Sequence, residues 1–303
     1  MKKLVLLAGL LLVGAACSKN DEVKQDSTDD GGQGKVTTPV AEAPAVYPTE
    51  KQGDDQNYRT TTYELDGKKV KKVVEETYQD GQKRDDSTTV TEVTYTDKKY
   101  PTKLVETTNG NTRQLEYTYD NKNRVTAMEL TQGTNKEKRT FEYDEKGRVT
   151  KEVHTQPGVE PITTVYTYPD DKTVVEKNPS DPNRTKIYTF ENGNLVKSTY
   201  EWKDANGQVM ISETYTYKYD TTIKNPEASL ERQLVRLNYF YNPLFFERNS
   251  KNVVTERVFE GVDHTIPLQP RTTTYTYEKN DKGYPTKVTE KGQGYETVTL
   301  LTY

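Results

Sequence analysis

Two stretches of the chain, YTYDNKNRVT at residues 117–126 and FEYDEKGRVT at residues 141–150, carry the same pattern 24 residues apart. In each stretch two aromatic residues flank a polar one, and an aspartate, a short polar segment and Arg-Val-Thr follow. Alternate residues of a strand point to the same face. Aspartate, asparagine and glycine favour turns because they tolerate left-handed backbone angles. Each copy therefore predicts a strand with an aromatic face, a turn and a second strand.

Looser copies of the pattern extend along most of the chain, at 93–104, 166–174, 188–196 and 275–288. A single hairpin is only marginally stable, so neighbouring hairpins must pack together to bury their aromatic faces. We expect an all-β fold, a long antiparallel meander of about 14 strands that twists and curls because large flat sheets are unusual. Strict alternation in the second strand of a copy would place Val149, Lys151 and Val153 on one face.

The amino terminus predicts secretion and lipidation. A basic start, an apolar run from Leu4 to Val13 and small residues before Cys17 form a signal peptide at 1–16. The apolar run is shorter than the roughly 20 residues that a membrane-spanning helix needs. Cys17 is the single cysteine, and we expect its thiol to carry a lipid that anchors the protein to a membrane. The alternative is cleavage elsewhere, which would leave Cys17 incidental.

A polar segment separates this anchor from the repeats. Residues 17–57 contain almost no bulky apolar residue, which predicts a disordered, lipidated tether. The repeat domain is expected at 58–303, with an insertion at about 221–252. The formal net charge of −4 becomes −6 when Lys2 and Lys3 leave with the signal peptide, and this argues against nucleic acid as a partner.

Two sequence features resemble known proteins. The motif YxYD followed by xxGRV resembles the YD repeat of RHS-type proteins. Residues 18–22, Ser-Lys-Asn-Asp-Glu, resemble the export signal of surface lipoproteins of the Bacteroidota type. Together they are similar to small Bacteroidota surface lipoproteins with domains of unknown function. The resemblance implies the repeat fold and a location on the outer face of the outer membrane; a plain polar tether start would look similar to the export signal.

One segment departs from the repeat. Residues 225–228, Asn-Pro-Glu-Ala, predict the start of a helix that continues to about residue 238. The most aromatic run of the chain follows, and its candidate binding residues are Tyr239, Tyr241, Phe245 and Phe246. This segment is either a plug that fills the concave side of the sheet or a surface for a ligand. Trp202, the sole tryptophan, is either sheet core or a platform for a sugar.

The sequence shows no catalytic motif, and neither a cofactor nor a metal is expected. His154 and His264 lie far apart in sequence, and a zinc site needs more ligands. Acids such as Asp120 and Asp144 are explained by the turns in which they lie, although weak calcium binding is an alternative for them.

We expect a non-catalytic surface lipoprotein that binds a glycan or a protein ligand at the outer membrane. The alternatives are an accessory subunit that docks on an envelope complex through a sheet edge or the concave face, and a glycan-acting hydrolase.

Overall fold

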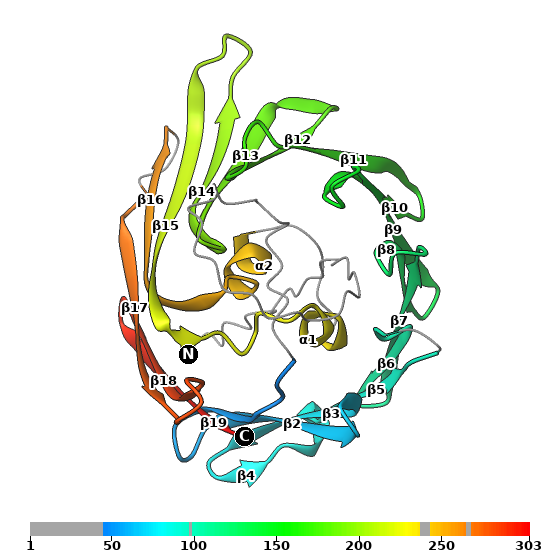
Figure 1. Ribbon diagram of the computed structural model, residues 1–303, viewed down its shortest axis with the longest axis vertical. Helices are drawn as coiled ribbons and strands as arrows, with labels where there is room; N and C mark the ends of the chain where they lie inside the picture. Colours follow the sequence, from blue (N-terminus) through cyan, green and yellow to red (C-terminus); the bar gives the residue numbers. More distant parts are fainter. Residues whose placement is uncertain (1–44, 97–98, 237–242, 265–267) are drawn as a thin grey trace, which may run out of the picture.

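The computed structural model describes residues 45–96, 99–236, 243–264 and 268–303. These residues form one antiparallel sheet that closes on itself, with two short helices inside the ring (Figure 1). The all-β prediction is confirmed. Among the described residues, no helix is both long and apolar enough to cross a membrane.

The first half of the sheet comprises β1 (Thr49–Gly53), β2 (Tyr58–Asp66), β3 (Lys69–Gln79), β4 (Gln82–Lys83), β5 (Thr89–Thr94), β6 (Lys103–Thr108), β7 (Asn111–Tyr119), β8 (Val125–Gln132), β9 (Asn135–Tyr143) and β10 (Val149–Gln156). The second half comprises β11 (Val159–Thr167), β12 (Thr173–Asn178), β13 (Asp181–Glu191), β14 (Asn194–Lys203), β15 (Val209–Lys224), β16 (Asn252–Asp263), β17 (Arg271–Lys279), β18 (Pro285–Gly292) and β19 (Tyr295–Thr302). The helical elements are the 3₁₀ turn η1 (Asp85–Ser87), α1 (Leu230–Val235) and α2 (Pro243–Arg248).

Strand β1 closes the sheet. Its Glu50 lies opposite Thr61 of β2 on one side and opposite Leu301 of β19 on the other. Eighteen strands therefore form a barrel, and β4 pairs only with β3. The predicted curled meander is therefore a closed barrel. Its described strands leave no long free edge of the kind expected for docking, and they outnumber the predicted 14 or so. The physical reason is that residues 49–53, placed in the expected tether, supply the strand that joins the two ends.

Each YD turn is held by its aspartate. The carboxylate of Asp120 accepts hydrogen bonds from the backbone N–H groups of Lys122 and Arg124, both 2.9 Å long. Within this turn Asn123 adopts a left-handed backbone conformation with a φ of 58°. In the next copy Asp144 accepts the N–H of Arg148 at 2.8 Å. The prediction that these aspartates belong to the turns is therefore confirmed.

Side chains of the motif also link one hairpin to the next. The hydroxyl of Tyr143 donates a hydrogen bond of 2.6 Å to the carbonyl of Val125, in the preceding copy. Its ring lies 4.5 Å from the guanidinium of Arg124, which pairs with Asp120. Four further tyrosines donate in the same way to an earlier carbonyl: Tyr119, Tyr168, Tyr219 and Tyr277. The motif thus supplies both the turn and the contact between repeats.

A β-bulge near the start of the strand after each of these two YD turns changes which side chains of that strand point inward. The register shifts between Val149 and Lys151, so Val149 is buried while Lys151 pairs with Glu142 on the outer face at 2.8 Å. Glu152 points inward instead and is 5% exposed. The prediction that Val149 and Lys151 share a face is wrong, because one extra residue inverts the alternation beyond it.

Helices α1 and α2, together called the plug, lie inside the barrel (Figure 1). Leu234 of α1 is fully buried, and its carbonyl accepts a hydrogen bond of 2.8 Å from the hydroxyl of Tyr117 on β7. Phe246 of α2 is also fully buried, with ring centroids 4.5 Å from Tyr188 and 5.2 Å from Phe190. The helix begins at Leu230, later than the predicted start at 225–228. Asn225 instead binds the carbonyls of Arg248 and Ser250, 2.9 and 2.8 Å away, and so closes the base of the insertion.

A buried group of charges ties the plug to the closing strand. The guanidinium of Arg232 donates to the carbonyl of Val46 at 2.6 Å and pairs with Glu50 and, at 2.7 Å, with Glu227. Arg236 lies within 3.4–3.6 Å of Glu50, Glu75 and Glu227. Burial alone would raise the pKa of Glu227, but the neighbouring arginines outweigh burial and lower it to about 2. The plug therefore holds β1 in place from the inside.

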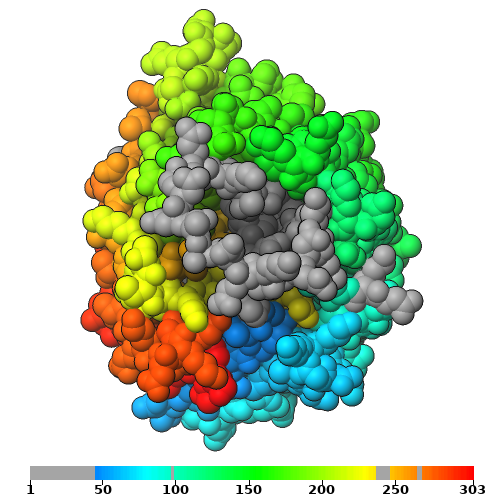
Figure 2. Space-filling view, viewed as in Figure 1, coloured from blue at the N-terminus to red at the C-terminus, as the bar shows by residue number. Residues whose placement is uncertain are grey.

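The wall is continuous around this interior, and the hairpin of β14 and β15 extends beyond the rest of the ring (Figures 1 and 2). On the outer face, charged residues pair across neighbouring strands, as in Lys138–Glu129 at 2.5 Å and Lys287–Glu278 at 3.0 Å. Charged side chains thus alternate with the inward-facing aromatic ones.

Candidate functional site

A row of side chains crosses five neighbouring strands on the inner face of the barrel. The strand register places Tyr188 of β13, Ser198 of β14, Tyr215 of β15, Phe259 of β16 and Arg271 of β17 side by side. These residues, called the inner row, come from positions of the chain more than 80 residues apart at the extremes. Cross-strand neighbours on one face are in contact range, so the row forms a continuous surface.

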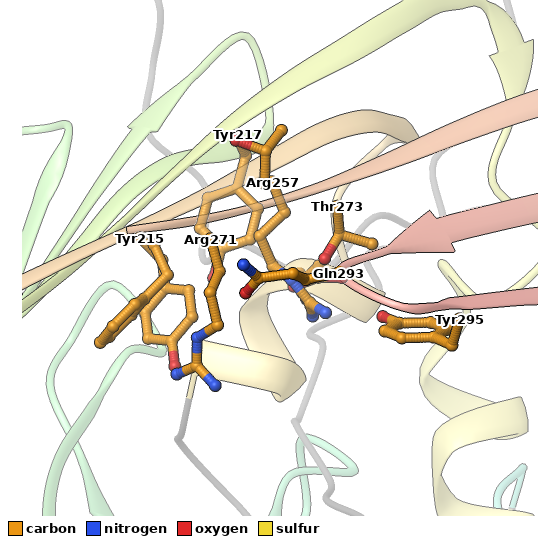
Figure 3. A pocket seen from close by; sticks show the side chains of 10 residues that line it. Tyr215, Tyr217, Arg257, Arg271, Thr273, Gln293 and Tyr295 are labelled. Atoms are coloured by element: carbon orange, nitrogen blue, oxygen red, sulfur yellow. The ribbon is translucent and has the colours of Figure 1, made fainter. Parts of the chain in front are cut away.

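A cavity of about 580 Å³ lies between this part of the wall and α2 (Figure 3). Residues of β15 to β17, α2 and the β18–β19 hairpin line it: Tyr215, Tyr217, Glu247, Arg257, Phe259, Arg271, Thr272, Thr273, Gln293 and Tyr295. Arg271 begins β17 and Gln293 lies in the turn after β18, so the cavity lies toward the strand ends opposite the YD turns. Its size is within the range of small-molecule sites, roughly 300–1,000 Å³.

Aromatic rings form one side of the cavity. The rings of Tyr215 and Phe259 lie 5.1 Å apart at an angle of 51°. The guanidinium of Arg271 lies over the face of Phe259, 4.6 Å from its centroid. Tyr215 is half-buried, and Arg271 is exposed to the cavity. The three side chains together present flat apolar faces next to a positive charge.

A carboxylate and a second guanidinium form the other side. Nη1 of Arg257 lies 3.6 Å from Oε2 of Glu247, and this oxygen has no hydrogen-bond partner among the described residues. Burial raises the pKa of Glu247, and the nearby Arg257 opposes that shift without reversing it. Figure 3 shows the side chains of Arg257 and Arg271 on the same side of the strands, with Tyr215 next to Arg271.

A second cavity of about 350 Å³ continues the surface along the wall. It shares Tyr215 with the first cavity and is also lined by Lys186, Tyr188, Ser198, Thr199, Tyr200 and Glu213. The amine of Lys186 and the hydroxyl of Tyr188 both donate to Glu176, at 2.7 Å each. Tyr215 is thus the residue that the linings of the two cavities have in common.

Trp202 belongs to the same face. It lies two residues after Tyr200 on β14, and the register places it between Arg184 of β13 and Ile211 of β15. Its side chain is half-buried. Trp202 is not among the described residues that line either cavity, so the sugar platform and the core residue both stay predictions.

Of the other sequence-based candidates, the structure describes the side chain of Phe246 alone. Tyr239 and Tyr241 lie outside the described residues, as do Cys17 and the side chain of Phe245. Phe246 is fully buried against Tyr188 and Phe190, which favours the plug interpretation at this position.

Buried acids elsewhere in the barrel are held by their neighbours. Glu152 pairs with Arg139 at 2.7 Å and accepts a hydrogen bond of 3.1 Å from the hydroxyl of Tyr166. Burial raises the pKa of Glu152, and Arg139 opposes the shift. His154 lies 3.3 Å from Glu137. These contacts explain the groups as parts of the packed wall.

Sequence reasoning missed the main lining residues of the first cavity. Tyr215 and Tyr217 form another YxY pair, and Phe259 and Arg271 lie on the two strands that follow. The pair could have been found as a further copy of the motif. Its neighbours could not, because their alignment depends on the exact register of three strands and on the long connection through the plug.

No known protein family and no curated protein matches the chain. Among solved structures, a porin-like protein from Bacteroides uniformis is similar with a TM-score of 0.46 and 12% identity, over 86% of this chain and 98% of that one. A porin-like protein from Bacteroides vulgatus gives 0.35 and 17%, over 67% and 98%. The structure of TcdB2–TccC3–Cdc42 gives 0.32 and 16%, over 82% of this chain and 12% of that one. At TM-scores below 0.5 these similarities carry no inference about function.

Proposed function

We propose that this chain is a non-catalytic, lipid-anchored protein of the outer membrane whose barrel interior binds a glycan. The observation that carries the proposal is the run of aromatic side chains along two cavities that meet at Tyr215. The lipid anchor and the location are supported by the amino-terminal sequence, in which Cys17 follows a signal peptide and precedes a short acidic segment.

The chemistry of the surface suits a sugar chain. A pyranose ring offers C–H groups on its faces and hydroxyl groups at its edge, so it needs flat apolar partners flanked by polar ones. Tyr200, Tyr215 and Phe259 supply the aromatic faces. Gln293 and Thr273 supply polar groups beside them. A mainly apolar cavity with a few polar groups is the usual form of a ligand site.

The alternative function is an accessory subunit of an envelope complex, and the described sheet offers such a subunit no free edge through which to dock. Both long edges of the described sheet are occupied, because β1 pairs with β2 and with β19. A partner protein would have to use the concave interior or the protruding β14–β15 hairpin instead.

A glycan array probed with the protein from residue 45 onward tests the proposal. We expect binding to a defined set of glycans and loss of that binding in Tyr215→Ala, because Tyr215 lines both cavities. Tyr58→Ala is a matched control, since Tyr58 stacks on Tyr78 at 4.4 Å and lines neither cavity. Retention of all binding by Tyr215→Ala would refute the site. Release of reducing sugar from a bound glycan would favour the hydrolase instead.

A further inference from the structure

The guanidinium of Arg271 has no acidic partner among the residues that the structure describes. Five other arginines of the wall interior and the plug pair with carboxylates: Arg113, Arg139, Arg232, Arg236 and Arg257. No hydrogen bond or ion pair joins the guanidinium of Arg271 to any residue that the structure describes; its contact is with the ring of Phe259. A guanidinium that rests on an aromatic ring inside a cavity keeps its N–H donors available to a ligand.

The position of Arg271 defines what such a ligand must carry. Its planar group matches a carboxylate or a sulfate, which it binds through two parallel hydrogen bonds. The adjoining rings of Phe259 and Tyr215, 5.1 Å apart, offer the surface on which a sugar ring would stack. An acidic group attached to that ring would then reach the guanidinium.

The other charged residues that line the cavity offset each other. Arg257 and Glu247 form an ion pair at 3.6 Å, so one carries a positive and the other a negative charge into the same lining. The positive charge of Arg271 is then left without a pairing among the described residues. Opposite charges attract more strongly in a partly enclosed cavity than in open water.

We propose that Arg271, supported by Phe259 and Tyr215, is the recognition point for the acidic group of an anionic glycan, carboxylated or sulfated. This inference rests on the proposed function and adds the ligand class to it. A neutral glycan would fill the same cavity and leave the guanidinium without a partner. Affinity should therefore depend on the acidic group and on Arg271 together.

The test compares acidic glycans with neutral forms of the same glycans. An array carries uronate-containing and sulfated oligosaccharides beside their carboxyl-reduced and desulfated forms, and it is probed with the wild-type protein, Arg271→Gln and Arg271→Lys. Arg84→Gln is the control, because Arg84 is exposed near η1 and lines neither cavity. Thermal unfolding of each variant verifies that it is folded; Arg271 is exposed to the cavity, so little change is expected.

We expect wild-type protein to bind one or more acidic glycans roughly 10- to 100-fold more tightly than their neutral forms, since a charge-assisted hydrogen bond is the difference. Arg271→Gln should reduce binding to the neutral level, and Arg271→Lys should recover part of it. Hits among carboxylated or among sulfated glycans identify which acid is recognised. Equal binding of acidic and neutral forms, or an unchanged preference in Arg271→Gln, would overturn the inference and leave the proposed function intact. Absence of any glycan binding would overturn both.

Discussion

Replacement of Phe246 by alanine should destabilise the whole barrel, because this one side chain anchors α2 to the wall. Phe246 is 0% exposed and packs against Tyr188 and Phe190, with ring centroids 4.5 and 5.2 Å away. A phenylalanine side chain buries about 150–250 Å² at about 25 cal/mol per Å², which corresponds to about 4–6 kcal/mol. Large-to-small changes of buried aromatic residues cost about 3–5 kcal/mol when measured. We therefore expect a loss of about 4 kcal/mol in the free energy of unfolding.

Urea unfolding of the protein from residue 45 onward, followed by circular dichroism, measures this loss. A domain of this size loses roughly 2–4 °C of melting temperature per kcal/mol, so the melting temperature should fall by roughly 10 °C. Leu300→Ala is the control, because Leu300 is 43% exposed and should cost well under about 1 kcal/mol. A change below about 1 kcal/mol in Phe246→Ala would show that α2 does not hold the wall, and would refute the plug interpretation.

Four further outcomes follow from the same contacts. Tyr143→Phe should cost about 1 kcal/mol in urea unfolding, because it removes the hydroxyl that donates at 2.6 Å to the preceding repeat; no change would mean that the repeats are held together without it. Arg232→Met should cost about 3 kcal/mol, since it leaves the half-buried carboxylates of Glu50 and Glu227 without this partner, and a neutral effect in the same assay would contradict that role. The pKa of Glu227 is lowered, so its carboxylate stabilises the fold above its unfolded pKa, and this contribution is lost as the pH falls from about 4.5 toward 2. Glu227→Gln should therefore make stability depend less on pH in that window. Identical acid unfolding curves for both proteins would argue against the ion pairs. Cys17→Ser should abolish lipidation and release the protein from membranes; a mature wild-type protein with an unmodified thiol in mass spectrometry would disprove the anchor.

The repeat fold was predictable from the sequence because its cause is local. The aspartate of each YD motif fixes a turn within five residues, as Asp120 does through its bonds to Lys122 and Arg124. The alternating aromatic residues before it determine which face is buried. A period of 24 residues then repeats the same hairpin, and no long-range information is needed.

Closure of the barrel was not predictable in this way. It depends on β1, a five-residue strand with little hydrophobic patterning, Thr-Glu-Lys-Gln-Gly at 49–53. This strand is held by pairing on both sides and by the contact between Glu50 and the buried Arg232 of α1, 182 residues away in sequence. Neither interaction has a local signature. The bulge at Val149 likewise follows from the register with the neighbouring strand and not from the residue types.

The candidate site was partly predictable. Trp202 was singled out by its residue type, and it lies on the face that bears the cavities. The aromatic run that ends in α2 drew attention to the plug, where Phe246 is core. The residues that line the first cavity, above all Arg271 and Phe259, could be found only from the cross-strand register that brings them together.

The central claim, that a glycan binds inside the barrel, is tested most directly through the fluorescence of Trp202. It is the sole tryptophan of the chain, and it lies on the face of β14 that carries Tyr200, a residue of the second cavity. Titration with a glycan selected on the array should change the fluorescence emission of Trp202 until it saturates. The dissociation constant from this titration should equal the one measured by calorimetry. Tyr215→Ala should abolish the change in emission. Calorimetric binding with an unchanged Trp202 signal, and with full affinity in Tyr215→Ala, would place the ligand elsewhere and contradict the account.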